Sequence, residues 1–266
     1  MDEITPQDAP AVRRLRFTVA YEGTPWQGWQ GQPNGFGIQN RIEKAMAAVT
    51  KEPVSFQAAG RTDTGVHALC QTAHCDVPAR LAIPPERWVR AINGGLPPSI
   101  RILTCEEAAP DFHARFCAQG KIYRYRIHRA EIMPPLEADR AWHVRGPVNF
   151  DLLAQCLAKV KGTHNFARLS ANRGFEGEAK LRAIPANTTR TIHSAEFRET
   201  PEGLEIEVAG NGFLYKMVRL IVGACLHVAR ERDPIDWFNA LLDDPTGPKG
   251  NQCAPAGGLY LVKVFY

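Results

Sequence analysis

The chain of 266 residues is 44% hydrophobic and 23% charged, which is typical of a globular protein with one large or two modest domains. Its formal net charge of +4 suits a polyanionic partner only if the positive charge gathers on one face. No apolar run reaches the roughly 18 residues that a membrane-spanning helix needs, so we expect no membrane association.

The cysteines and the first residues bear on the cellular compartment. The seven cysteines are an odd number without a Cys-x-x-Cys pair, which favours reduced thiols in the cytosol over a disulfide framework. Residues 1–12 include an acidic, proline-containing start without the basic and apolar regions of a signal peptide, and we expect a flexible tail. The sequence therefore predicts a cytoplasmic protein.

The first half of the chain alternates strands and helices. The pattern predicts a strand over 13–21, a helix over 38–50, strands over 54–58 and 67–77, a helix over 85–93 and a strand over 100–107. A turn over 22–30 carries Trp26 and Trp29, whose indoles are expected to pack this turn against the core. The order β-α-β-β-α-β is that of ferredoxin-like units and RNA recognition motifs, and it predicts an N-terminal unit over 13–112.

The second half repeats this order after an additional strand over 121–127, in which tyrosines and arginines alternate. The further predicted elements are a strand over 140–145, a helix over 152–160, a hairpin of 191–198 with 204–209, an apolar helix ending near 230, a helix that starts at Asp233-Pro234 with Asp233 as N-cap, and a strand over 259–266. We therefore predict a C-terminal unit over 113–266. The fold class is α+β, with two ferredoxin-like units whose mainly antiparallel sheets join across a central cleft.

One long segment, 163–189, has no clear period and contains four cations, Arg168, Arg173, Lys180 and Arg182. A loop of this length is either a solvated excursion or a binding element whose cations contact phosphates. The residues alone leave both readings open.

The stretch Gly-Arg-Thr-Asp-Thr-Gly-Val-His-Ala spans residues 60–68 between two predicted strands. Asp63 is therefore expected at a turn, projecting from a strand pair. An aspartate there can simply close the turn by accepting backbone N–H bonds, or it can carry chemistry.

The nearby group of His67, Cys70, His74 and Cys75 has the residue types of a metal site. On a strand, however, Cys70 and His74 face one side and the other two face the opposite side. We predict neither a metal nor a cofactor, since the sequence also lacks a phosphate-binding loop.

The stretch 60–68 resembles the active-site signature of the TruA family of tRNA pseudouridine synthases. The resemblance continues in Gly-x-Gly-Phe-Leu-Tyr-x-Met-Val-Arg at 210–219 and Ala-Pro-Ala-x-Gly-Leu at 254–259, and it covers the chain from residue 21 to 266. Thr64, Lys216 and Leu220 stand where the family often has Ala, His and Asn, and these differences concern only the fine shape of the pocket.

The resemblance implies an isomerase that converts uridine to pseudouridine at positions thirty-eight, thirty-nine and forty of the tRNA anticodon stem-loop. It also implies a homodimer with tRNA as its partner and no cofactor. Asp63 would be the nucleophile or charge stabiliser, Arg219 its ion-pair partner, and Tyr123 the residue that stacks on the uracil. Arg61 would fill the gap left by the flipped base, and Leu259 would line the pocket.

Two alternatives compete with this hypothesis. A non-catalytic RNA-binding protein built from paired recognition-motif-like units would need stacking aromatics and basic strands, but not Asp63. A nucleoside or glycoside hydrolase would normally need a second carboxylate as general acid, and no Asp or Glu near the signature offers one.

Overall fold

The computed structural model describes residues 12–171 and 187–266, which form two compact units. One unit contains residues 12–118 together with Tyr266, and the other contains residues 119–265. Residues 1–11 of the predicted tail lie outside the described residues, and so do Arg173, Lys180 and Arg182. Among the described residues, no helix combines the length and the apolar character needed to cross a bilayer.

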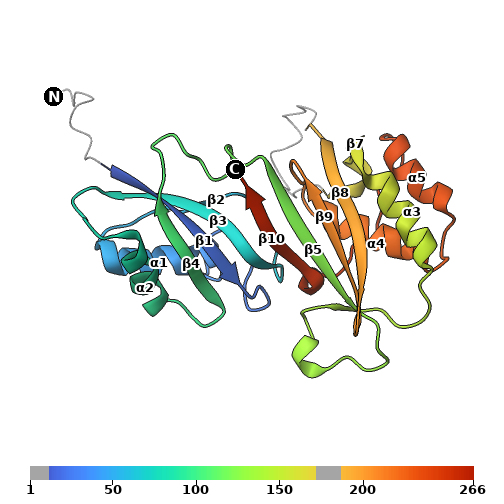
Figure 1. Cartoon of the computed structure of the whole chain (residues 1–266), viewed down its shortest axis with the longest axis horizontal. Coiled ribbons are helices and arrows are strands. Elements are labelled where there is room, and N and C mark those ends of the chain that lie inside the picture. Colours follow the sequence, from blue (N-terminus) through green and yellow to red (C-terminus); the bar gives the residue numbers. More distant parts are fainter. Residues whose placement is uncertain (1–11, 172–186) are drawn as a thin grey trace. The chain divides into compact units, whose positions relative to one another are not determined.

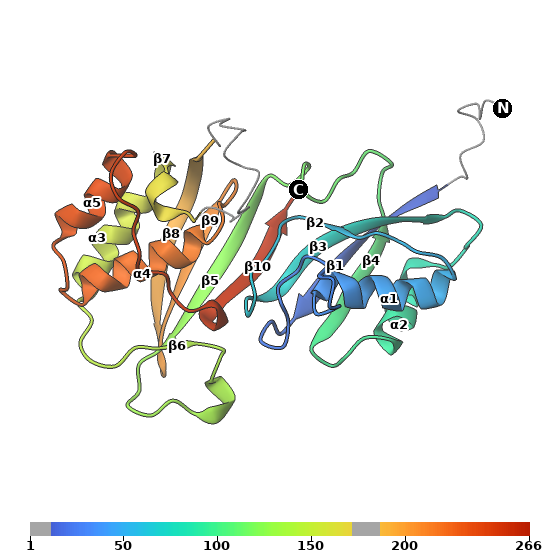
Figure 2. The ribbon, with the colours of Figure 1, turned by 180° about the vertical axis from the view of Figure 1, so that it is seen from behind.

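The first unit has the predicted β-α-β-β-α-β order. Its elements are β1 (Val12–Tyr21), α1 (Ile38–Thr50), β2 (Gln57–Ala58), β3 (His67–Pro78), α2 (Pro85–Gly94) and β4 (Ile100–Glu107). Strand β1 lies between β3 and β4 and is antiparallel to both. Helices α1 and α2 lie on one face of these strands (Figures 1 and 2). The side chains of Leu15, Phe17 and Val19 are fully buried, as their alternation predicts.

The predicted strand over 54–58 is wrong in length, because only Gln57 and Ala58 form a strand. The backbone just before them bonds to helix side chains instead. Phe56 N donates to Glu43 Oε1 at 2.9 Å, and Phe56 O accepts from Gln39 Nε2 at 3.1 Å. The apolar alternation therefore reflects packing onto α1 rather than pairing in a sheet.

The second unit is an antiparallel sheet with helices on one face. Its elements are β5 (Gly120–His128), β6 (Trp142–His143), α3 (Phe150–Val160), β7 (Gly162–Asn165), β8 (Thr189–Thr200), β9 (Gly203–Gly210), α4 (Met217–Ala229), α5 (Ile235–Asp243) and β10 (Leu259–Phe265). The strand order is β10-β5-β9-β8-β7, and β6 pairs in parallel with β5. Helices α3, α4 and α5 cover one face of this sheet (Figure 2).

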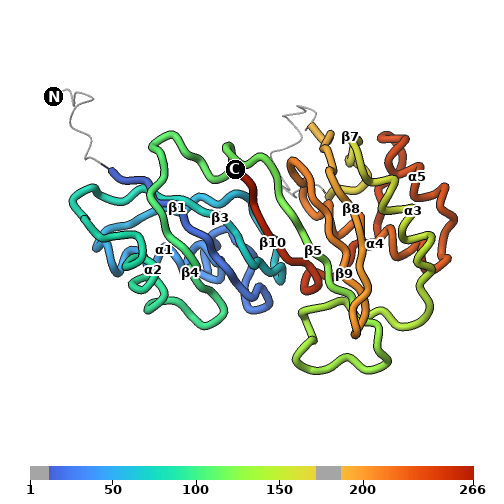
Figure 3. Tube along the Cα trace, in the orientation of Figure 1, coloured from blue at the N-terminus to red at the C-terminus, as the bar shows by residue number. Residues whose placement is uncertain are grey.

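Each unit is thus α+β with mainly antiparallel strands, and the predicted fold class is confirmed at that level. The tube in Figure 3 follows the long connection from β5 to α3, which carries β6 and a short 3-10 helix, Pro135–Glu137. Strand β7 was not predicted, because four residues are too few for a period to be recognised.

The predicted N-cap of the helix after residue 232 is wrong. Helix α5 begins at Ile235 with Pro234 in the cap position and no capping side chain. The carboxylate of Asp233 instead lies 2.7 Å from His227 Nε2, on the preceding helix. The histidine therefore competes successfully with the helix terminus for this carboxylate.

Candidate active site

The signature loop presents Asp63 from a closed turn. Val66 N donates to the main-chain carbonyl of Asp63 at 3.1 Å, so the turn over residues 63–66 is closed by backbone. The side chain of Asp63 is half-buried, and the preceding Arg61 is exposed. The carboxylate therefore lies at the shoulder of a fixed turn, where the sequence predicts it.

A buried pair of hydroxyl groups, those of Tyr21 and Thr62, supports this loop. The hydroxyls of Tyr21 and Thr62 lie 2.8 Å apart, and both side chains are buried. Burial raises the pKa of the Tyr21 phenol above its ordinary value, and the hydrogen bond to Thr62 offsets only part of this. Gln71, also buried, donates from Nε2 to Gly60 O at 2.8 Å. Because unpaired buried polar groups are costly, this arrangement fixes the loop in one position.

A second segment, residues 22–30, holds the loop from the side. Gly23 N donates to His67 Nδ1 at 3.0 Å, and Trp29 N donates to Thr62 O at 3.1 Å. A Cβ on Gly23 would lie 2.1 Å from Val66 O, so the two backbones touch directly. The sequence alone could not predict that the backbone at Val66 packs against Gly23.

The same segment contains Gly28, whose φ is +80° and whose Cβ would lie 2.4 Å from Thr62 O. Trp26 and Trp29 are 7% and 1% exposed. Their predicted role in packing this turn against the core is confirmed. The buried indoles fix the segment 22–30 against the core. Its glycines, Gly23 and Gly28, in turn contact the backbone on either side of Asp63.

In the second unit, Tyr123 lies in β5 opposite Val208 of β9 and Leu261 of β10. Its ring is 8% exposed and meets the ring of Phe213 edge-on, with centroids 5.0 Å apart. Phe213 was not singled out from the sequence, although it belongs to the motif at 210–219. This edge contact fixes the plane of the tyrosine ring.

Arg219 lies in the first turn of α4 and is half-buried. Its Nε donates to Ala254 O at 2.7 Å, and Ala254 N donates back to Arg219 O at 3.1 Å. The segment 254–259 thus holds this arginine through main-chain groups at both its guanidinium and its backbone.

Tyr125 connects the other residues of this group. Its hydroxyl donates to Pro255 O at 2.7 Å, and Leu259, which is 6% exposed, is its partner across β10. Burial raises the pKa of the Tyr125 phenol, while the nearby charge of Arg219 acts to lower it. Tyr123 is two residues along the same strand face, about 7 Å away. The second unit therefore gathers Tyr123, Arg219 and Leu259 around Tyr125.

Arg61 and Asp63 belong to the first unit, and these three residues belong to the second. The ion pair of Asp63 with Arg219 stays a prediction.

The two histidines of β3 that belong to the candidate metal group each accept a hydrogen bond from a backbone N–H. His67 Nδ1 accepts from Gly23 N, and His74 Nδ1 accepts from Ala114 N at 3.2 Å. Burial lowers the pKa of His74, which keeps its ring neutral at its backbone donor. Within the ranges 12–171 and 187–266, no group of three or more His, Cys, Asp or Glu side chains could hold a metal ion.

Comparison with known proteins decides the family. A family model described as tRNA pseudouridine synthase matches residues 18–117 and 157–266. The chain belongs to the tRNA pseudouridine synthase family. It is 42% identical over 257 residues to tRNA pseudouridine synthase A of Akkermansia muciniphila, covering 96% of each chain. It is 38% identical over 255 residues to the protein of the same name from Bacillus pumilus, covering 95% of this chain and 99% of that one.

One arginine considered for phosphate contact in this family member is instead structural. Arg168 is 6% exposed; its Nε donates to Pro248 O at 2.6 Å, and its Nη1 donates to Ala240 O and Asp244 O at 2.6 and 3.0 Å. It therefore caps the carboxyl end of α5, where a cation is favoured. Neither alternative for the segment 163–189, a solvated excursion or a phosphate contact, describes Arg168, whose guanidinium is buried and bonded within the protein.

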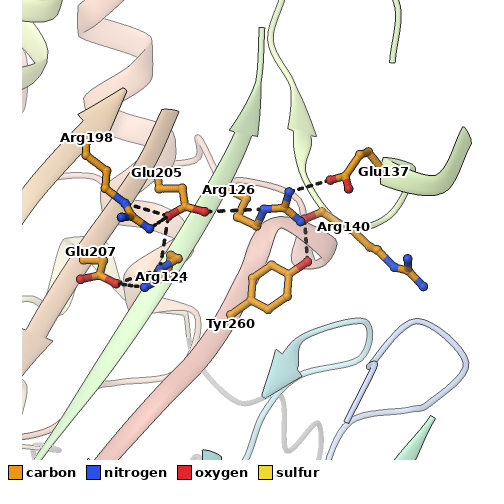
Figure 4. Close-up of polar contacts among 8 residues, drawn as sticks. All are labelled: Arg124, Arg126, Glu137, Arg140, Arg198, Glu205, Glu207 and Tyr260. Atoms are coloured by element: carbon orange, nitrogen blue, oxygen red, sulfur yellow. Dashed lines mark hydrogen bonds and ion pairs between the residues drawn. The ribbon is translucent and has the colours of Figure 1, made fainter. Parts of the chain in front are cut away.

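The arginines of β5 are also engaged within the protein. Arg124 and Arg126 point away from the buried tyrosines of the same strand, as predicted, and form an ion-pair network with the carboxylates around them (Figure 4). Three arginines meet three glutamates in this network, which comprises Arg124, Arg126, Arg198, Glu137, Glu205 and Glu207. Because the charges within this network balance, the network itself adds little attraction for a polyanionic substrate.

Proposed function

We propose that this chain isomerises uridine to pseudouridine in tRNA. The N-glycosidic bond breaks, the uracil rotates, and a carbon–carbon bond joins it to the same sugar. Uridine and pseudouridine are isomers, so no redox partner, energy donor or water is consumed. Family membership over most of the chain supports this reaction, and so does the 42% identity with a relative named tRNA pseudouridine synthase A.

The observation that carries the proposal is the half-buried Asp63 on a turn held from two sides. A catalytic group must be fixed close to its productive geometry, and the contacts on both sides of this turn hold Asp63 in that way. In the proposed mechanism Asp63 attacks the ribose or the uracil ring, or stabilises an oxocarbenium-like sugar.

The remaining roles follow the family signature. Arg219 pairs with Asp63 and keeps it ionised, which charge-assisted hydrogen bonding favours by about 1.5–3 kcal/mol. Tyr123 stacks on the uracil and relays the proton that leaves C5, while N1 of the base gains a proton. Arg61 fills the space vacated by the flipped nucleotide, and Leu259 lines the pocket.

The finer substrate and assembly assignments are part of the same proposal. The target uridines lie at positions thirty-eight, thirty-nine and forty of the anticodon stem-loop, and the protein works in the cytoplasm as a homodimer. The long match to the family signature and the tRNA substrate support these assignments. Recognition of adjacent positions would depend on RNA shape and phosphates more than on base identity.

Replacement of Asp63 tests the mechanism most directly. Asp63→Ala and Asp63→Asn should each lower tritium release from tRNA containing 5-tritiated uridine by at least about a thousandfold, because the attacking carboxylate is lost. Binding of tRNA should persist within about twofold, since the loop is held by main-chain contacts and by Thr62. The exposed Asp111 provides the control: Asp111→Ala should retain full release.

The same assay examines Arg219. Arg219→Ala should lose most of the activity, and Arg219→Lys should recover a part of it, because lysine keeps the charge without the planar fork. Unchanged release by the Asp63 variants refutes the catalytic assignment. Near-normal turnover by Arg219→Ala removes this arginine from the site.

A further inference from the structure

A pocket of about 300 Å³ opens in the second unit along the C-terminal half of α4. On the helix it is lined by Gly223, Leu226, His227 and Arg230, which are three or four residues apart and therefore share one face. The facing wall is the segment 251–253. Its volume is at the lower end of the roughly 300–1,000 Å³ of ligand sites, which suits a single nucleotide-sized molecule.

The lining carries two guanidinium groups. Arg230 donates from Nη2 to Arg145 O at 3.2 Å, which holds its head group in place. Arg232 is exposed, and within the part of the chain that the structure describes no side-chain or backbone acceptor pairs with its guanidinium. Both arginines are therefore placed to meet an anion.

Among the described residues that line the pocket there is no carboxylate, although two lie in the adjoining turn. Asp233 is 2.7 Å from His227 Nε2, and Glu231 Oε1 accepts from Asn149 Nδ2 at 3.2 Å. Both acids keep their negative charge, so a phosphate here is bound through direct hydrogen bonds from the two guanidinium groups rather than through a net positive charge.

The carboxyl end of α4 lies beside the pocket and would by itself repel an anion. A helix end carries about half an elementary negative charge. Its last carbonyls are moreover occupied, since Leu226 O, Val228 O and His227 O accept from the N–H groups of residues 230, 231 and 232. Anion binding at this site therefore depends on the hydrogen bonds that Arg230 and Arg232 can donate directly.

Trp142 of β6 adds a flat aromatic wall to this cationic site. Its indole meets the ring of Tyr125 edge-on, with centroids 6.3 Å apart at 84°, so its plane is fixed. An indole in a fixed plane is a platform on which any base can stack, and the exposed Asn251 opposite supplies a carboxamide for hydrogen bonds.

We propose that this pocket binds one nucleoside phosphate, with the phosphate on Arg230 and Arg232 and the base on Trp142. Where the nucleotide is part of substrate RNA, this rests on the proposed function. The pocket lies on the same helix as Arg219, since Gly223, which lines the pocket, follows Arg219 by one turn, and both residues contact the segment 252–254. This spacing of about 6 Å along the helix favours substrate RNA over a free nucleotide as the source.

The first experiment measures tRNA binding at several salt concentrations in the inactive Asp63→Ala background. Arg232→Ala should raise the dissociation constant about tenfold and reduce the log–log salt slope by about one, as expected for one lost phosphate contact. Lys44→Ala, an exposed lysine on α1, removes the same charge far from the pocket along the sequence and should change affinity less than about twofold.

In the active background Arg232→Ala should raise KM and leave kcat unchanged at saturating tRNA. Equal losses for the Arg232 and Lys44 variants, or none for either, overturn the pocket assignment. Full activity of the Asp63→Ala variant would instead refute the proposed mechanism. The tRNA affinities of the Arg232 and Lys44 variants would still test the pocket.

The second experiment separates the two sources of the nucleotide, using tryptophan fluorescence with uridine 5′-monophosphate or tRNA as titrant. A signal that disappears in Trp142→Phe and weakens in Arg232→Ala supports the pocket. If only tRNA gives it, the ligand is a nucleotide of the RNA; if the monophosphate gives it too, free nucleotides also occupy the site. The absence of a Trp142-dependent signal with either titrant overturns the proposal.

Discussion

The loop that carries Asp63 and the segment that holds Arg219 are fixed in different ways. The Asp63 loop lies over a buried hydrogen bond between side chains, Tyr21 and Thr62, and also touches the glycines of a neighbouring turn. The segment at 252–255 is held by main-chain groups: Gln252 O lies against Gly223, Ala254 bonds twice to Arg219, and Pro255 O accepts from Tyr125.

This difference has a practical meaning. A loop supported by hydroxyl groups weakens when a hydroxyl is removed, whereas a segment seated against a bare helix backbone is displaced when a methyl group is added. Three substitutions test this contrast, from the most damaging to the mildest.

The largest effect is expected from Gly223→Ala. Alanine normally stabilises a helix interior by about 1 kcal/mol relative to glycine. Here its Cβ would lie 1.7 Å from Gln252 O, so the segment that seats Arg219 must move. We expect at least about a hundredfold loss of tritium release, and a destabilisation of about 3 kcal/mol in urea unfolding.

Gly94→Ala is the matched control, because Gly94 ends α2 with nothing within 4 Å of its Cβ position. It should leave activity unchanged. If Gly223→Ala and Gly94→Ala show the same tritium release, the contact between Gly223 and the segment 252–254 does not position Arg219 for catalysis.

Gly28→Ala should have the next largest effect. Its Cβ would lie 2.4 Å from Thr62 O, and its φ of +80° adds backbone strain. We expect kcat to fall about thirtyfold or more, because the turn carrying Asp63 shifts. Gly35 has a φ of +76° but no atom within 4 Å, so Gly35→Ala carries the strain alone, about 1–2 kcal/mol, without the contact. Equal kcat values for the two variants would show that the contact between Gly28 and the Thr62 carbonyl does not position Asp63.

Thr62→Val is expected to be the mildest. It leaves the buried Tyr21 hydroxyl without this partner and should cost about 1–3 kcal/mol of unfolding free energy, with a loss of activity of only a few-fold. In a double-mutant cycle, Thr62→Val with Tyr21→Phe should cost less than the sum of the single changes, because both polar groups are then removed. Strict additivity would show that the hydroxyls are not coupled.

Much of the fold could be predicted from the sequence, because apolar periodicity and turn residues mark elements that bury one face. The limits of α1 and β4 agree with the prediction, since Ile38, Ile42 and Met46 form one buried stripe. The prediction failed where backbone groups or side chains bond outside their own element. The segment before β2 bonds to helix side chains, and Asp233 bonds to a histidine rather than to a helix end.

The candidate site shows the same limit. The motif predicts that Asp63 lies at a turn, and the structure agrees at that level. The sequence could not show that Ala254 holds Arg219 or that Phe213 fixes the ring of Tyr123, since such contacts join residues distant in sequence. The sequence left the role of Arg168 open, because an arginine that caps a distant helix looks the same in sequence as a solvated one.

The bond from Ala254 N to Arg219 O also supplies a natural reporter. An amide in an irregular segment ordinarily exchanges its proton with solvent quickly, but this one is retained for as long as the segment remains docked on α4. The rate of deuterium exchange at the Ala254 amide therefore reports how often the segment that holds Arg219 separates from α4. This measurement needs no substrate.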